Sequence, residues 1–215
     1  MNRPNNVRRA VVAAAATAAT LIALPGCGSD TAARDPAVDA APAADPTRAP
    51  EIASWATVGG IAVPLGAVDG PTSDPGRPFT GFTHTPQGAA LAAISQSVQL
   101  SVATDGQWST ILPAVTAPGP GRDAYAAHRA LVSVSGTDPA VVPDIVGYRI
   151  TDYTDTAADV SVVQRFPDDS LAASRTAVVF TGGDWKLDLP TGGGTAVTAL
   201  DAEPAEMVAL DRPGR

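Results

Sequence analysis

Cysteine, lysine, histidine and aromatic residues are all scarce in this chain of 215 residues. The one cysteine, Cys27, excludes an intramolecular disulfide and any zinc site that needs several thiolates. The single lysine, Lys186, and a net charge of -8 leave no basic surface of the kind that nucleic-acid binding requires. With only two histidines, we also expect no metal centre and no other cofactor. Aromatic residues make up 5% of the chain, so few large side chains can fill a core.

Glycine and proline are abundant by contrast, with 20 of each. They predict long loops and linkers rather than continuous helix. The length fits one domain of ordinary size with appendages and is too short for two full domains. We therefore predict four parts: a signal peptide in residues 1–26, a lipidated tether in 27–54, a folded domain in 55–190 and a Gly-, Pro- and acid-rich tail in 191–215.

The N-terminus has the pattern of a secretory signal. Three arginines precede the apolar stretch 10–24, and no acidic residue lies among them. This stretch of 15 residues is shorter than the roughly 20 that a membrane-spanning helix needs. A cleaved signal is the preferred interpretation, and an uncleaved anchor helix is the alternative.

Leu24-Pro25-Gly26-Cys27 follows the apolar stretch and resembles the lipobox of bacterial lipoproteins. Pro25 departs from the pattern, which usually has a small residue such as alanine or serine there. The resemblance implies cleavage between Gly26 and Cys27 and attachment of diacylglycerol, with acyl chains such as palmitate, to the Cys27 thiol. Two acyl chains hold a protein stably on a membrane, so the protein would be exported and anchored to the outer face of the cytoplasmic membrane. A chance buried cysteine is the alternative.

The segment after Cys27 is rich in alanine, proline and aspartate and has almost no large apolar side chain. Such a composition cannot bury enough surface to offset the entropy of ordering, so a disordered tether is expected over residues 27–54. Removal of residues 1–26 leaves 11 basic and 22 acidic side chains, a net charge of -11. Anionic headgroups repel this charge, so the folded domain should stand off the membrane surface.

Within residues 55–190 the pattern predicts short extended pieces, then helices, then strands. Thr85 and Pro86 have the residue types of a helix N-cap and first turn, and this helix should end near residues 105–106. A second helix is expected over 122–134, after an apolar cluster at 108–115. Its inward side chains would be Tyr125, Leu131 and Val132.

The last part of the domain changes to an alternating apolar pattern. It predicts strands over 146–153, 158–166, 174–181 and 184–189, and one further short element at 207–210. Turn residues at spacings of a dozen or so separate these strands, which favours an antiparallel meander. The expected fold is α+β, with N-terminal helices packed on a curved antiparallel β-meander in a cone-like arrangement.

Two resemblances follow from these residues. Helices followed by a meander that closes on Gly183-Asp184-Trp185-Lys186-Leu187 resemble the nuclear transport factor 2-like cone over roughly residues 85–190. The same closing sequence, with Val63-Pro64, Gly70-Pro71 and residues 81–89, resembles an uncharacterised family of actinobacterial secreted and lipid-anchored proteins over about 55–190. Members of this family are commonly associated with integrative conjugative elements, and related cones serve as periplasmic components of type IV secretion systems. The resemblance implies an assembly role and supplies no catalytic residue.

The sequence holds none of the common catalytic motifs. Gly-x-Ser-x-Gly, Ser-x-x-Lys and His-Glu-x-x-His are all absent. His84 could contact a ligand, but support of the helix cap beside it is the preferred interpretation. Asp152, Asp155 and Asp159 are interpreted as solvated turn acids rather than calcium ligands. We therefore predict that the protein is not an enzyme.

The interior between helix and sheet decides between two functions. Seven side chains are expected to line it, as a filled core or as an open pocket: Leu91, Ile94, Val98, Tyr148, Val162, Phe166 and Trp185. A filled interior favours a non-enzymatic envelope interaction or assembly module with a protein partner, linked to a conjugation or secretion apparatus. An open interior favours a lipoprotein that binds a small apolar ligand. In both cases the lipid on Cys27 contacts the membrane, and no nucleic acid is bound.

Overall fold

A computed structural model describes residues 44–192 and 194–212, and these form an α+β domain. The predicted signal peptide, Cys27 and most of the predicted tether lie outside the described residues. The three α-helices are α1 (Pro86–Ser101), α2 (Trp108–Val115) and α3 (Pro120–Arg129), and a 3₁₀ turn, η1, covers Pro139–Val141. The strands are β1 (Ile52–Val58), β2 (Ile61–Gly66), β3 (Asp144–Tyr153), β4 (Ala157–Arg165), β5 (Leu171–Thr181), β6 (Asp184–Leu187), β7 (Val197–Leu200) and β8 (Val208–Ala209).

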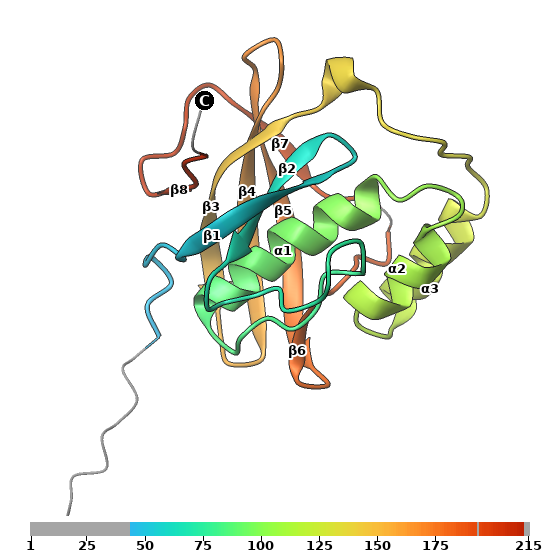
Figure 1. Cartoon of the computed structure of the whole chain (residues 1–215), viewed down its shortest axis with the longest axis horizontal. Helices are drawn as coiled ribbons and strands as arrows, with labels where there is room; N and C mark the ends of the chain where they lie inside the picture. The colour runs from blue at the N-terminus through green and yellow to red at the C-terminus, as the bar shows by residue number, and fades with distance from the viewer. Residues whose placement is uncertain (1–43, 193, 213–215) are drawn as a thin grey trace, which may run out of the picture. The chain divides into compact units, whose positions relative to one another are not determined.

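The strands form two antiparallel sheets. The larger has the order β6-β5-β4-β3-β8, and β7 pairs with β5 beyond the end of β6. The smaller is the hairpin β1–β2. Figure 1 shows α1 crossing in front of the larger sheet, with the hairpin beside it and with α2 and α3 at one side. No helix in the described part of the chain is long and apolar enough to cross a membrane.

Helix α1 begins where the sequence predicts and is more deeply buried than its single apolar stripe predicts. The Thr85 side chain accepts a hydrogen bond from the Gly88 N–H, and Pro86 occupies the first turn. Of its 16 residues, 14 are buried. The sheet covers one side of α1, while β2, the loop before α1 and α2 cover the others. Alanines and a glycine on these other sides allow the close approach.

The region after α1 differs from the prediction in two ways. Residues 108–115 were expected only as an apolar cluster but form a helix, α2. Pro113 within this helix hid the helical spacing. Helix α3 ends at Arg129 rather than near residue 134, and Leu131 and Val132 are 82% and 56% exposed instead of facing inward. The helix ends early because the buried Arg129 guanidinium donates to the carbonyl oxygens of Val132 and Ala103, which turns the chain back towards α1.

The predicted meander is present as β3, β4, β5 and β6, and both boundaries of the domain differ from the expectation. The expected tail, 191–215, contributes β7 and β8 to the sheet, because β3 and β5 offer free edges for pairing. At the other end, ordered structure begins before residue 55. The buried Gln87 side chain donates to the carbonyl oxygens of Asp45 and Arg48, and the Arg48 guanidinium donates to its Oε1.

Candidate functional site

Six of the seven side chains expected between helix and sheet lie in one hydrophobic core. Their exposed fractions are 0–3%. They are Leu91, Ile94, Val98, Tyr148, Val162 and Trp185. Phe166 is only half-buried and lies outside this core, because β4 ends at Arg165 and a turn follows. None of the seven borders the two pockets described below, and the interior is filled at the six core positions.

A buried carboxylate, Asp69, holds the start of α1. It is 4% exposed, and its Oδ1 accepts hydrogen bonds of 2.8 Å from the hydroxyls of both Thr83 and Thr85. The same Thr85 oxygen caps α1, so Asp69 orients the cap. Tyr148 lies within electrostatic reach: burial raises the pKa of its hydroxyl, and Asp69 raises it further. That hydroxyl has no hydrogen-bond partner among the described residues.

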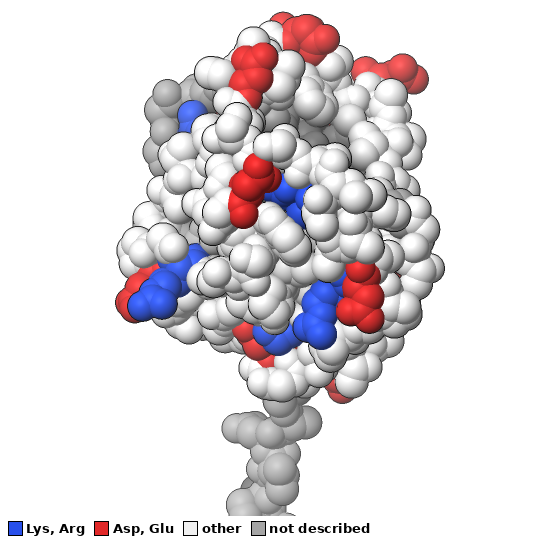
Figure 2. Space-filling model, turned by 90° about the vertical axis from the view of Figure 1, so that its right-hand side faces the viewer, with Lys and Arg blue, Asp and Glu red and all other residues white. Residues whose placement is uncertain are grey.

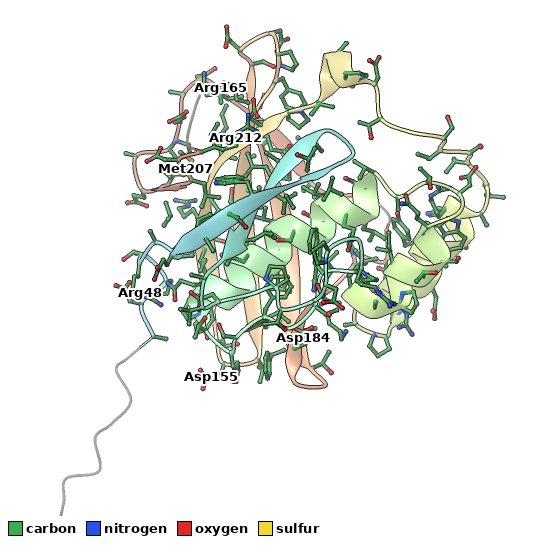
Figure 3. All side chains as sticks on the ribbon, in the orientation of Figure 1. Arg48, Asp155, Arg165, Asp184, Met207 and Arg212 are labelled. Atoms are coloured by element: carbon green, nitrogen blue, oxygen red, sulfur yellow. The ribbon has the colours of Figure 1, made fainter. Side chains whose placement is uncertain are left out.

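A second carboxylate fixes the loop before α1 to the end of the sheet. Asp184 accepts hydrogen bonds of 2.9 Å from the backbone N–H groups of Gly81 and Phe82. The next residue, Trp185, donates from Nε1 to the Thr83 carbonyl oxygen at 3.0 Å. Figure 3 shows Asp184 at the start of β6 beside this loop. The segments 70–71, 81–89 and 183–187, which are far apart in the sequence, therefore meet at one end of the domain.

The imidazole of His84 is held against the sheet. It stacks on the Phe180 ring with centroids 3.7 Å apart and planes 10° apart, and its Nε2 contacts the carbonyl oxygen of Asp155. This arrangement fits the predicted supporting role beside the cap. Among the described residues, no group of three or more His, Cys, Asp or Glu side chains could hold a metal ion. Of the three acids predicted to lie in a turn, Asp155 lies between β3 and β4, but Asp152 is in β3, and Asp159 is in β4, where it forms a 2.6 Å ion pair with Arg175.

A groove of about 880 Å³ lies beside the C-terminal half of α1. Residues 55–59, from β1 and its turn, form one wall, and the Pro-rich loop 71–79 forms the other. Gln99 of α1 and Val102, which follows α1 directly, also line the hollow, as does the start of α2. We call this hollow the β1 groove.

The loop wall of the β1 groove is fixed to α1 through one glutamine. The Gln99 Oε1 accepts from the Phe79 N–H at 2.9 Å, and its Nε2 donates to the Arg77 carbonyl oxygen at 3.0 Å. The neighbouring Gln96 donates to the carbonyl oxygens of Phe79 and Trp185. Since both hydrogen bonds of Gln99 are largely screened from water, the loop cannot collapse into the groove without breaking them.

The segment after α3 closes one end of this region and is organised by Asp105. Its carboxylate accepts from the Ser133 hydroxyl at 2.6 Å, the Val134 N–H at 2.9 Å and the Arg129 guanidinium at 2.9 Å. These bonds, that from Ser133 first, lower the pKa of Asp105 to about 2. Figure 2 shows the side of the molecule that lies on the right in Figure 1. Charged side chains are few on this side and both signs are interspersed, so most of its surface is uncharged.

We expect the Asp105 carboxyl to titrate with a midpoint near 2 in the folded protein, against an ordinary value of 3.8. Because the folded-state pKa is lowered, its stabilisation is complete above the ordinary pKa and is lost as the pH falls towards 2. Carboxyl chemical shifts measured by NMR across this range test the expectation. A midpoint near 3.8 for Asp105 would contradict the hydrogen-bonded arrangement.

A second pocket, of about 430 Å³, lies where β6 and β7 separate along β5. Its polar side chains from the helices are already bonded: the hydroxyls of Ser97, Ser101 and Tyr125 donate to carbonyl oxygens of α1. The rest of the lining is mixed: it includes the apolar Leu100 and Leu189 and three charged residues, Asp159, Arg175 and Asp188, of which Asp159 and Arg175 form an ion pair. We call this hollow the β5 pocket.

Sequence reasoning identified the loop 81–89 and the segment 183–187 but missed the β1 groove and the β5 pocket. Both hollows are lined by segments that are distant in the sequence. Asp69 was not singled out, because an acidic residue beside glycine has the pattern of an ordinary turn, and the role of Asp184 in binding the loop before α1 was not predicted. The one available signal was Gly59-Gly60 between two apolar runs, which is typical of a tight hairpin.

Comparison with known proteins gives a family and no function. The sequence matches a domain of unknown function (DUF8175) over residues 10–203. The chain belongs to this family. The DUF8175 match starts within the apolar N-terminal stretch and contains Cys27, all three α-helices and strands β1–β7. No curated protein and no solved structure matches the chain.

Proposed function

We propose that this chain is a bacterial lipoprotein, anchored through Cys27 to the outer face of the cytoplasmic membrane. Its folded domain is a non-enzymatic module that binds a protein partner in the cell envelope, within a conjugation or secretion apparatus. The basic N-terminus, the apolar stretch of 15 residues and the lipobox-like Leu24–Cys27 support the anchor. The DUF8175 match begins at residue 10 and so includes the apolar stretch and Leu24–Cys27, but not the three arginines before them.

The β1 groove is the observation that carries the binding role. It is large, it is bordered by both apolar and polar side chains, and Gln99 holds its loop wall in place. The interior between α1 and the sheet is filled at six of the seven expected positions, which favours a surface contact over an enclosed ligand. The order of three helices followed by the meander β3–β6 also agrees with the cone-like arrangement expected from the sequence.

The anchor limits where the groove can meet its partner. Within residues 44–192, the first contact with the domain is at Asp45, which lies 18 residues after Cys27. A chain of that length spans at most about 60 Å. The net charge of -11 after signal removal opposes contact with anionic headgroups. The partner must therefore present its binding segment close to the membrane but above its surface.

Site-specific photo-crosslinking in intact cells tests this function. A photo-reactive residue at Thr110, which borders the groove, should give a discrete adduct with an envelope protein. The matched control is the neighbouring Ser109, which is exposed on the same helix but does not border the groove. Equal adducts from both positions, or none from Thr110, would contradict the proposal.

The β5 pocket favours a second candidate function, the binding of a small apolar ligand. Its volume of about 430 Å³ lies within the range of small-molecule sites, and its helix hydroxyls are internally bonded. Native mass spectrometry of the delipidated chain should then show a bound mass that Ala177→Trp abolishes. A chain of unaltered mass would exclude this function.

A further inference from the structure

The geometry of the β1–β2 hairpin shows which backbone groups of β1 are free. Gly59 and Gly60 have φ angles of +55° and +89°, as in a two-residue type I′ turn. The turn hydrogen bond joins Val58 and Ile61, which are paired in the register. Bonded and non-bonded positions alternate along an antiparallel pair, and the register is regular from Ser54 to Val58. The N–H and C=O groups of Thr57 and Trp55 therefore point away from β2.

This free edge borders the β1 groove. Trp55 and Thr57 both line it, and they belong to a run of five consecutive lining residues, 55–59. Successive side chains of a strand point to opposite faces of the sheet. Because consecutive residues of β1 all line the groove, the backbone of β1 itself must border it. Among the described strands, β1 pairs with β2 alone. Unpaired strand edges of this kind are templates for a further strand.

The spacing of these free groups matches a polypeptide backbone. Five residues of extended chain span about 17 Å, so a segment of similar length can pair along Trp55–Gly59. Such a segment would place alternate side chains against the apolar side chains of Ala56, Val58 and Leu65, which share one face of the hairpin in the observed register. Pairing by backbone bonds gives affinity, and the pockets for alternate side chains give specificity.

Charge defines one further property of the occupant. Among the residues that the structure describes, Arg77 is the one charged residue that borders the groove. It is exposed on the loop wall and forms no ion pair within the described part of the chain. A carboxylate on the bound segment would therefore meet an available guanidinium, which favours charge-assisted hydrogen bonds.

We propose that the partner binds the β1 groove as an extended segment, adding a strand to the free edge of β1 and placing an acidic side chain against Arg77. This inference rests on the proposed function and specifies the chemistry of its partner. The segment belongs to another envelope protein.

Selection from a phage-displayed library of random 12-residue peptides tests this mode of binding. The bait is the full-length lipidated chain in detergent, and the counter-selection uses Thr57→Pro. Proline removes the outward N–H of Thr57 without removing a bond to β2. Thr57→Val keeps the N–H and is the matched control. Urea unfolding shows whether Thr57→Pro retains the fold.

We expect selected peptides to alternate apolar residues and to contain an acidic residue. Synthesised singly, they should bind Thr57→Pro at least about tenfold more weakly than wild type and Thr57→Val with unchanged affinity. Arg77→Gln should lower affinity by a similar factor. Backbone N-methylation of alternate peptide residues should abolish binding to the unaltered protein, which tests strand pairing even if Thr57→Pro does not fold.

Three results would overturn the proposal. The first is that no peptide distinguishes wild type from Thr57→Pro, and the second is that N-methylated peptides bind as well as their parents. The third is that hydrogen exchange at the Trp55 and Thr57 amides is already slow in the isolated chain. That result would mean that its own N-terminal segment or a second copy occupies the edge. If one of these three results is found together with a crosslinked adduct from Thr110 in cells, the proposed function stands and this mode of binding is rejected.

Discussion

Replacement of Trp185 by alanine should lower the free energy of unfolding by about 3–5 kcal/mol. The Trp185 side chain is 0% exposed, and its ring lies edge-on to Phe180 at 5.3 Å and tilted against Tyr153 at 6.1 Å. Its Nε1 also donates to the Thr83 carbonyl oxygen, which ties the loop before α1 to β6. Loss of the ring leaves a cavity and frees this loop. Urea denaturation monitored by circular dichroism measures the effect.

Two further variants separate packing from hydrogen bonding. Trp185→Phe keeps most of the ring volume and removes the donor to Thr83, so a cost of about 1–2 kcal/mol is expected. Trp108→Ala removes a tryptophan that is only partly buried on α2, and its cost should fall well below that of Trp185→Ala. If Trp185→Ala and Trp108→Ala destabilise the protein equally, Trp185 does not anchor the loop.

Replacement of Cys27 by alanine should move nearly all of the protein from the membrane fraction to the soluble fraction. Two acyl chains bury many methylene groups at about 0.8 kcal/mol each, and no other described feature of the chain provides a comparable anchor. Detergent-free fractionation of cells that express each form, followed by immunoblotting, measures the distribution.

Pro25→Ala is the matched control for the anchor, because it restores a residue usual at that position of a lipobox. Its product should remain in the membrane fraction. Retention of Cys27→Ala on the membrane would contradict lipidation and would favour an uncleaved N-terminal helix as the anchor.

Local signals explain which elements could be predicted. Thr85-Pro86 predicts the start of α1 to within two residues. The alternating apolar pattern predicts the ends of β3 and β4 to within two residues as well. The end of α3 depends on contacts of Arg129 with residues more than 20 positions away, so no local pattern contains it. Strand β7 exists because β5 extends beyond β6 and offers an edge, a property of the sheet rather than of residues 197–200.

The candidate site was predictable only in part, for the same physical reason. The closing sequence 183–187 and the loop 81–89 were recognised by resemblance, and the structure adds that Asp184 and Trp185 bind that loop directly. The β1 groove combines a strand edge, a proline-rich loop and two helices. Their juxtaposition follows from tertiary packing, as does the free edge of Thr57 that makes the groove suitable for an extended chain.

The proposed lipid at Cys27 is the central claim, because only with this anchor would the β1 groove lie in the envelope. Release of Cys27→Ala could also follow from altered export, so the mass of the mature N-terminal peptide is the more direct measurement. Mass spectrometry of protein extracted from membranes should show a peptide that begins at Cys27 and carries diacylglycerol. A mature peptide that retains residues before Cys27, or one that begins at Cys27 without lipid, would contradict the account.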